Sequence, residues 1–220
     1  MTALTTSRFV RRGGAALATL VLLGACPRPP KLTPLQGVAP AEARLPALEL
    51  PAGRRRVVFK WEMDNQGMLA RGEGVARVAP PDSARVDLFL GGGFGAASVI
   101  LLGDRTATPP GAGMTDLIPA APLLWATLGR LAIPALPDTI VRVAGDTLRA
   151  TVGRPVAWRI TAIGGILRRV ERVAGDRIVE FVDRTADGKK THYELASQRS
   201  LQLIVGDEQP AAFDASIWRY

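Results

Sequence analysis

The 220-residue chain has very little of what catalytic and metal sites are made from. It contains one cysteine, Cys26, and one histidine, His192, so no cluster of these residues exists to bind a metal ion. A single cysteine also excludes a disulfide within the chain, so the core alone must stabilise the fold. No serine stands in the pattern of a nucleophile elbow, and we interpret His192 as a residue on the outer face of a strand. We therefore expect no enzyme activity, no metal site and no cofactor.

The charge pattern is unlike that of a nucleic-acid-binding protein. The chain has 28 basic and 20 acidic residues, and three of the basic residues lie within its first 25 positions. No basic run is interleaved with aromatic residues, which make up only 5% of the chain. We expect no nucleic-acid partner.

Residues 1–25 have the features of a secretory signal peptide. Three arginines without an acidic residue precede an apolar run over residues 15–23, and the small residues Gly24 and Ala25 follow it. A transmembrane anchor is the alternative interpretation. The stretch from Gly13 to Ala25 is shorter than the roughly 20 residues that a membrane-spanning helix needs. The length therefore favours the signal peptide.

The end of this segment, Leu23-Gly24-Ala25-Cys26, resembles the lipobox of bacterial lipoproteins. In those proteins the cysteine thiol receives a diacylglycerol, the preceding peptide is removed, and the new amino group is acylated. The alternative is a free or buried cysteine, which would leave an unpaired thiol in an exported protein. The resemblance implies lipidation at Cys26, and several acyl chains on one residue give stable membrane attachment.

The stretch that follows is rich in proline. Residues 27–53 hold seven prolines and show no clean hydrophobic period, which argues against a continuous helix. We interpret residues 26–53 as a lipidated cysteine with a proline-rich tether, and residues 54–220 as one domain. Residues 45–51 (LPALELP) are apolar enough that packing of this part against the domain remains an alternative.

Hydrophobic and polar residues alternate along most of the predicted domain, with turn residues between the alternating segments. This pattern predicts about eleven strands of an antiparallel meander. The segments are residues 57–63, 72–78, 86–90, 97–102, 139–143, 148–152, 156–162, 166–173, 178–182, 191–195 and 201–205.

One segment, residues 114–132, has apolar residues at helical spacing instead. Its prolines predict a short first turn and a main helix from about Pro122, because proline is tolerated at a helix start. We expect this apolar helix to lie against the concave face of the curved sheet.

These features together resemble the bacterial lipoprotein-handling proteins LolA and LolB. The resemblance is carried by the signal and lipobox, by "RGEGVARVAPPDSARVDLF", by "GGGFGAAS" with "VILLGD" after it, and by "PLLWATLGRLAIP" before a second set of strands. It implies a mainly β fold, an antiparallel unclosed half-barrel of about eleven strands with a covering α-helix. In that family the enclosed apolar cavity takes the acyl chains of lipoproteins in transit to the outer membrane.

The resemblance also implies two kinds of site residue. The helix near Trp125 would act as a lid over a cavity, and Phe94 matches an exposed apolar residue that the family's receptor uses in delivery to the membrane. The alternative for Phe94 is a side chain that folds back onto the sheet rim. The expected cavity residues are Phe59, Trp61, Leu88, Val99, Leu101, Trp125, Leu128, Val141, Leu148, Trp158 and Ile160.

Two functions follow from this fold. The first is a monomeric, membrane-anchored envelope lipoprotein, at the periplasmic face of the outer membrane, that binds lipid or lipoprotein acyl chains and acts in lipoprotein localisation. The second is a non-catalytic scaffold or accessory lipoprotein that docks on an envelope protein partner, with a half-barrel filled by its own side chains. Small residues on the inner faces favour the hollow interior, and these are Gly72, Gly74, Ala76, Ala97, Ala150 and Ala162.

Overall fold

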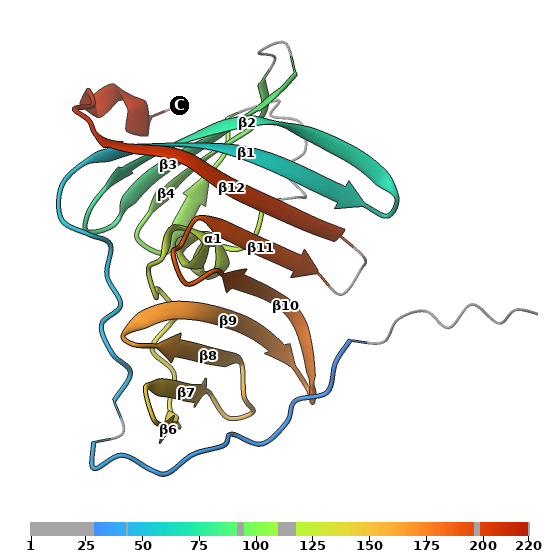
Figure 1. The fold of residues 1–220 in the computed structure, drawn as a ribbon, viewed down its shortest axis with the longest axis vertical. Coiled ribbons are helices and arrows are strands. Elements are labelled where there is room, and N and C mark those ends of the chain that lie inside the picture. The colour runs from blue at the N-terminus through green and yellow to red at the C-terminus, as the bar shows by residue number, and fades with distance from the viewer. Residues whose placement is uncertain (1–28, 43, 92–94, 110–117, 196–198, 220) are drawn as a thin grey trace, which may run out of the picture.

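A single curved, antiparallel β-sheet makes up most of the protein. The structure is a computed structural model that describes residues 29–42, 44–91, 95–109, 118–195 and 199–219. Within these ranges there are twelve strands (Figure 1). They are β1 (Arg55–Asn65), β2 (Met68–Ala79), β3 (Ser83–Leu90), β4 (Gly95–Leu102), β5 (Arg105–Ala107), β6 (Ile140–Ala144), β7 (Thr147–Val152), β8 (Trp158–Ile163), β9 (Ile166–Ala174), β10 (Arg177–Arg184), β11 (Lys190–Leu195) and β12 (Arg199–Pro210).

The strand order explains why the sheet stays open. It runs β5-β4-β3-β2-β1-β12-β11-β10-β9-β8-β7-β6, so two meanders meet where the first long strand pairs with the last one. That central pair extends from Arg55↔Pro210 to Asn65↔Arg199. Strands β5 and β6 form the two edges and do not pair with each other. The predicted mainly β, antiparallel and unclosed architecture is confirmed.

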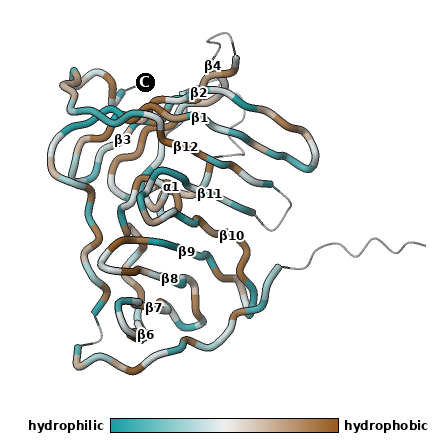
Figure 2. The backbone as a smooth tube through the Cα atoms, in the orientation of Figure 1, coloured by the Kyte–Doolittle hydropathy of each residue, from teal (hydrophilic) through white to brown (hydrophobic). Residues whose placement is uncertain are grey.

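Each of the eleven predicted segments corresponds to a strand, and β5 is the additional one. Its residues Arg105, Thr106 and Ala107 are all exposed, so no hydrophobic alternation marks it. In the long strands one face is buried and the other is not. Figure 2 shows hydrophobic and hydrophilic residues alternating along these strands, as period-two burial requires.

The covering helix is α1 (Ala121–Leu128), with a proline in its first turn as predicted. It ends at Gly129, whose backbone is left-handed (φ 97°) and whose N–H donates to the Ala126 carbonyl at 3.1 Å. The prediction that the helix continues to Ala132 is therefore wrong, because the left-handed glycine ends the helix at Leu128. None of the helices in the described part of the chain combines the length and the apolar character needed to cross a membrane.

Helix α1 lies inside the curve of the sheet and packs against β9, β10 and β11 (Figure 1). Its Leu123 and Trp125 side chains are completely buried. The Trp125 indole N–H donates a 2.6 Å hydrogen bond to the carbonyl of Gly103, in the turn between β4 and β5. One buried side chain thus ties the helix to the opposite half of the sheet.

The stretch predicted as a tether lies against the domain over much of its length. The Pro30 carbonyl accepts a 3.0 Å hydrogen bond from the N–H of Ile178, and Val38 bridges Val143 on the edge strand β6. Leu48 and Leu50 are buried, so the packed alternative holds for the LPALELP segment. Figure 1 shows this segment following the end of the sheet before it enters β1. The predicted signal peptide and Cys26 lie outside the described residues.

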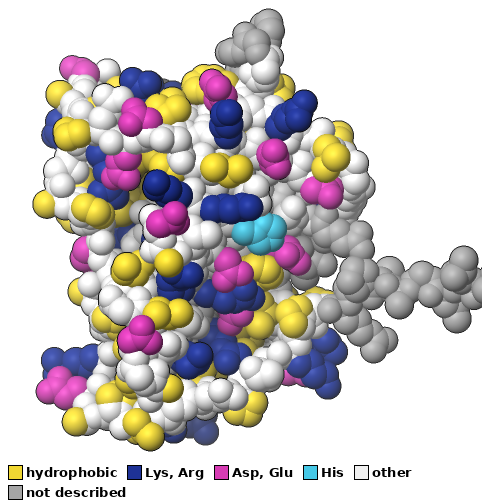
Figure 3. Space-filling view, in the orientation of Figure 1, with side chains coloured by type: hydrophobic (Ala, Val, Ile, Leu, Met, Phe, Trp, Pro, Cys, Tyr) yellow, Lys and Arg dark blue, Asp and Glu magenta, His cyan; other side chains and the backbone are white. Residues whose placement is uncertain are grey.

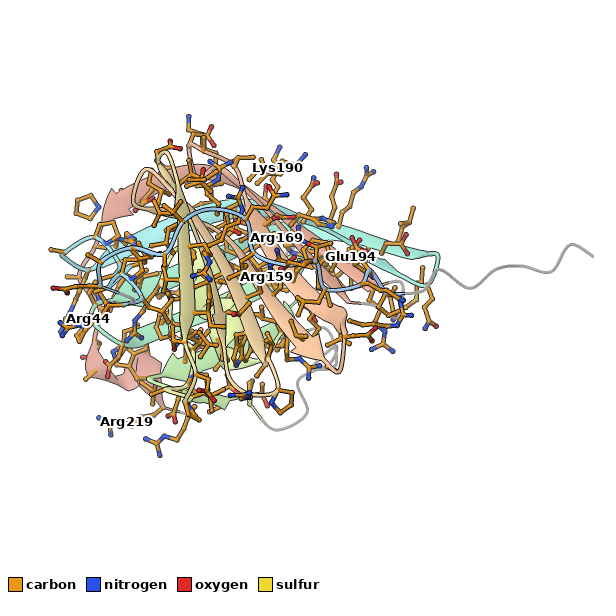
Figure 4. The ribbon with its side chains drawn as sticks, turned by 90° about the horizontal axis from the view of Figure 1, so that it is seen from below. Arg44, Arg159, Arg169, Lys190, Glu194 and Arg219 are labelled. Carbon is orange, nitrogen blue, oxygen red and sulfur yellow. The ribbon has the colours of Figure 1, made fainter. Side chains whose placement is uncertain are left out.

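The outer face of β8, β9 and β10 carries a ladder of charges. The carboxylate of Glu171 lies 2.6 Å from the Nε of Arg169 and 3.7 Å from that of Arg159, and Arg169 also pairs with Asp183. Figure 3 shows basic and acidic side chains interspersed on this side, and Figure 4 labels Arg159 and Arg169 there. This face is thus polar and largely self-neutralised.

Candidate functional site: an apolar trough beside helix α1

The inward faces of the central strands and one side of α1 line an apolar trough. Its lining comes from β1, β2, β3, β4, β11 and β12, from α1, and from Ile118 and Pro119, which lie shortly before the helix. The lining residues are Val57, Phe59, Trp61, Met63, Ala76, Val86, Leu88, Ala97, Ser98, Val99, Ile118, Pro119, Leu124, Thr127, Leu128, Thr191, Leu201, Leu203 and Val205. Among the residues that the structure describes, no ionisable side chain lines the trough.

The local sequence explains this composition. In β1 the buried residues Val57, Phe59, Trp61 and Met63 alternate with exposed or half-buried neighbours, so one face of the strand is continuously apolar. The few polar groups in the lining are already engaged. The Thr127 hydroxyl, for example, donates a 2.6 Å hydrogen bond to the Leu124 carbonyl within its own helix.

The trough is narrow. About 870 Å³ of space lies between its walls when the open mouth is included, but only about 60 Å³ is wide enough for the centre of a water molecule. One water needs roughly 10–15 Å³ by that measure, so the inner space holds only a few water-sized groups. An acyl chain therefore needs α1 or the lining side chains to move apart before it can enter.

Two of the small residues that favoured a hollow interior have a different role. A Cβ atom at Gly74 would overlap the ring of Phe59, and one at Gly72 would overlap the Phe89 carbonyl and press on the Trp61 indole. These glycines face the aromatic residues of β1 in the ladder, Gly72↔Trp61 and Gly74↔Phe59. The aromatic rings therefore occupy the space that the glycines leave, and the inference of hollowness from these two glycines is wrong.

The Trp61 indole makes use of that space. Its N–H lies 2.9 Å from the Glu73 carbonyl on β2 and 3.2 Å from the Phe89 carbonyl on β3. Because Gly72 has no side chain, the indole crosses β2 and reaches the next strand. The hydrogen-bonded ring forms a fixed wall of the trough.

The structure divides the predicted cavity residues into two groups. Five of the eleven line the trough: Phe59, Trp61, Leu88, Val99 and Leu128. The other six do not line it and belong to the packed core: Leu101, Trp125, Val141, Leu148, Trp158 and Ile160. The core residues of β6, β7 and β8 pack against one another and close that half of the interior, so the open space lies between α1 and the strands around β1.

Several lining residues were missed from the sequence. Leu201, Leu203 and Val205 on β12 alternate as inward-facing residues do, which was the available signal. Their place in the trough depends on the pairing of β12 with β1, which joins residues about 140 positions apart in the sequence. Phe94, the predicted membrane-contact residue, lies outside the described residues.

His192 lies away from the trough. Its ring is half exposed, its Nε2 is 3.2 Å from a carboxylate oxygen of Glu194, and it contacts the Phe181 ring at a centroid distance of 6.0 Å. The next residue, Tyr193, points inward and is buried. Burial, with a smaller effect of the neighbouring Glu180 carboxylate, raises the pKa of the Tyr193 phenol well above its ordinary value.

No protein-family model and no curated protein matches the sequence. Solved structures do match the fold. A LolA superfamily protein from Nitrosomonas europaea aligns with a TM-score of 0.52 at 12% identity, over 79% of this chain and 93% of that one. The fold of this chain is therefore similar to that of a LolA superfamily protein. A DUF1329 family protein from Desulfovibrio piger aligns with a TM-score of 0.50 at 8% identity, over 77% of this chain and 90% of that one. The LolA-like fold resemblance inferred from the sequence is thus confirmed.

Proposed function

We propose that the protein is a membrane-anchored envelope lipoprotein that binds the acyl chains of lipids or lipoproteins in the trough beside α1, without catalysis. The observation that carries this proposal is the trough lining, which is apolar and free of ionisable groups among the described residues. A site of this kind offers burial of hydrocarbon and no acid–base chemistry. The LolA-like fold supports a role in lipoprotein localisation, for a protein acting as a monomer.

The energetics suit reversible capture. Burying a chain of about sixteen carbons gains roughly 13 kcal/mol at about 0.8 kcal/mol per methylene. Association itself costs about 4–15 kcal/mol, and opening the narrow trough adds to that cost. The net affinity is therefore moderate, as a protein that takes up and releases its cargo requires. Helix α1 has only eight residues and is the element whose displacement would widen the trough.

The proposed anchor sets how the domain meets the membrane. Cys26 lies four residues before Pro30, which is hydrogen-bonded to β10. Four extended residues reach at most about 14 Å, so lipidation of Cys26 would hold the β9–β10 turn close to the bilayer. The strand registers place the β1–β2 hairpin at the same end of the sheet, where the Met68 and Leu69 side chains are 60% and 78% exposed. We infer that this end faces the membrane, and we propose that the membrane is the outer membrane, with the domain on its periplasmic face.

One experiment tests acyl-chain binding directly. The full chain carrying Cys26→Ser, so that no acyl group is attached, is titrated with a fluorescent fatty-acid probe and then with unlabelled palmitate. Ala76→Leu adds three carbon atoms inside the trough and is expected to weaken probe binding at least tenfold. Val75→Leu, one residue away on the outer face of β2, is the matched control and is expected to bind like the parent. Equal binding by the two variants, or no binding by the parent, would contradict the proposal.

The packed half of the interior favours the second candidate function. Core residues of β6, β7 and β8, such as Val141, Ala150 and Ile160, are almost completely buried and leave no space for cargo there. A non-catalytic scaffold that docks on an envelope protein partner needs no open trough. Absence of probe binding by the parent chain, with its fold intact, would support this second function.

A further inference from the structure

Four arginines lie near the end of the sheet opposite to the one that we infer to face the membrane, and two of them, Arg55 and Arg184, line a pocket there. Arg55 begins β1, Arg184 ends β10, Arg168 lies on β9, and Arg130 follows the helix terminus at Gly129. A pocket of about 490 Å³ opens among these elements. It is lined by Ala47, Leu48, Glu49, Pro51, Arg55, Leu128, Gly129, Gly165, Ile166, Leu167, Arg184 and Glu208. We call it the arginine pocket.

Two of the four arginines are paired with carboxylates. Arg55 Nε lies 3.0 Å from an oxygen of Glu208, and Arg130 Nε lies 3.3 Å from an oxygen of Glu49. These pairs account for both acidic residues in the pocket lining. No carboxylate in the described part of the chain is left in the pocket for Arg168 or Arg184, so the cluster has an excess of two positive charges.

The donors of the cluster confirm this excess. Among the described residues, the buried Nε atoms of Arg168 and Arg184 have no hydrogen-bond partner, and neither has the buried Nη1 atom of Arg130. Buried charged groups in proteins are almost always hydrogen-bonded, because an unpaired one keeps the full cost of its lost hydration. These buried donors leave positive charge around the pocket without an anionic partner, and an oxygen-rich anion in the pocket would offset that charge.

The position of Arg184 is well defined. Its Nη1 lies 2.8 Å from the point where a Cβ of Gly129 would stand, so the guanidinium packs on the glycine that ends α1. The C-terminal end of a helix carries partial negative charge, which holds a cation there. Burial, followed by repulsion from Arg168 and Arg55, lowers the pKa of Arg184, and Glu208 opposes this only in part. Perturbed ionisable groups of this kind are common at functional sites.

We propose that the arginine pocket binds a phosphate group. Guanidinium groups present their N–H donors in a planar fork that matches two oxygens of a phosphate. Arg184 lines the pocket and supplies such a fork, and the charge of Arg168 adds to the positive potential there. The phosphate comes either from a lipid headgroup or from a soluble phosphate compound. Leu128 lines both the arginine pocket and the trough, so a lipid held by its headgroup in the pocket has its acyl chain beside the trough.

The test uses the full chain carrying Cys26→Ser and three probes: inorganic phosphate, dodecyl phosphate and dodecanol, the last two below their aggregation limits. Binding is measured by calorimetry for the parent, for Arg184→Gln and for Arg56→Gln. Arg56 is exposed on the outer face of β1 and serves as the matched control. We expect Arg184→Gln to weaken the binding of a phosphate probe at least tenfold, and Arg56→Gln to change it less than twofold.

The probes distinguish the source of the phosphate. Binding of inorganic phosphate that depends on Arg184 supports a site for soluble phosphate compounds. Binding of dodecyl phosphate at least tenfold tighter than dodecanol, lost in Arg184→Gln, supports a lipid headgroup. If dodecanol does not bind at all, the acyl-binding proposal fails, but the result with inorganic phosphate still decides the phosphate site.

Two results would overturn the phosphate site. The first is that inorganic phosphate does not bind and dodecyl phosphate binds no more tightly than dodecanol. The second is that Arg184→Gln binds phosphate like the parent. The urea midpoint of Arg184→Gln separates a binding role from a structural one. A ligand-binding cation in a repulsive cluster leaves the midpoint unchanged or higher when it is removed, whereas a structural arginine would lower it.

Discussion

Replacing Trp125 with phenylalanine tests whether one side chain holds α1 across the sheet. The indole is completely buried, its N–H donates a 2.6 Å hydrogen bond to the Gly103 carbonyl, and the Arg130 guanidinium lies 4.8 Å from its ring centre. Losing the hydrogen bond costs about 1 kcal/mol, and the smaller ring leaves a cavity that costs roughly another 1–1.5 kcal/mol. A weaker cation–π contact adds about 0.5 kcal/mol at most. We expect Trp125→Phe to lower the free energy of unfolding by about 2–3 kcal/mol.

Urea unfolding followed by circular dichroism measures this change. Trp218→Phe is the matched control, because Trp218 lies in a short 3-10 helix, η2 (Ala215–Trp218), and is only half-buried. It is expected to lose less than about 0.5 kcal/mol, as surface substitutions do. The looser helix of Trp125→Phe is also expected to take up the fatty-acid probe faster than the parent. If Trp125→Phe lowers the free energy of unfolding by less than 1 kcal/mol, or by no more than Trp218→Phe does, then Trp125 does not hold α1 against the sheet.

Three further predictions follow from other parts of the sheet. Gly74→Ala forces a methyl group into the Phe59 ring and is expected to cost about 1–3 kcal/mol in thermal unfolding, while Gly206→Ala, whose Cβ meets nothing closer than 3.7 Å, is nearly neutral. The pKa of Tyr193 is raised in the folded protein. When the pH rises above about 10, the ordinary pKa of tyrosine, the phenol therefore loses its proton in the unfolded chain before it does so in the folded one. The free energy of unfolding then falls by up to about 1.4 kcal/mol per pH unit. Tyr193→Phe should remove that part of the alkaline loss, and an identical pH profile for both proteins would contradict the assignment. Leu69→Asp at the tip of the β1–β2 hairpin is expected to weaken binding of the chain to lipid vesicles in a flotation assay, and unchanged flotation would count against a membrane-facing hairpin.

Most of the fold could be predicted from local patterns. Each long strand buries one face, so period-two alternation marks the eleven longer strands, and only the short, wholly exposed β5 carries no such signal. The helix start was marked by proline, but its end depended on the left-handed conformation of Gly129, which the sequence shows only as one glycine among 23. Local rules therefore predict elements better than they predict where those elements stop.

The site was harder to predict, because long-range packing decides it. Whether a residue such as Trp125 or Ile160 lines open space depends on the half of the sheet against which α1 packs, and the inward-facing residues are apolar in both halves. Because they have no side chains, Gly72 and Gly74 suggest open space when only the sequence is considered, but neighbouring aromatic rings fill that space. Leu203 comes to the trough only because β12 pairs with β1.

The central claim, that an acyl chain enters the trough between α1 and the strands around β1, is tested most directly by photo-crosslinking. A fatty acid with a photoreactive group near its chain end is bound to the full chain carrying Cys26→Ser, irradiated, and mapped by peptide mass spectrometry. We expect crosslinks to trough residues such as Met63, Leu128 and Leu203, and we expect Ala76→Leu to abolish them. Crosslinks confined to β6, β7 and β8, or scattered over the outer face and unaffected by Ala76→Leu, would contradict it.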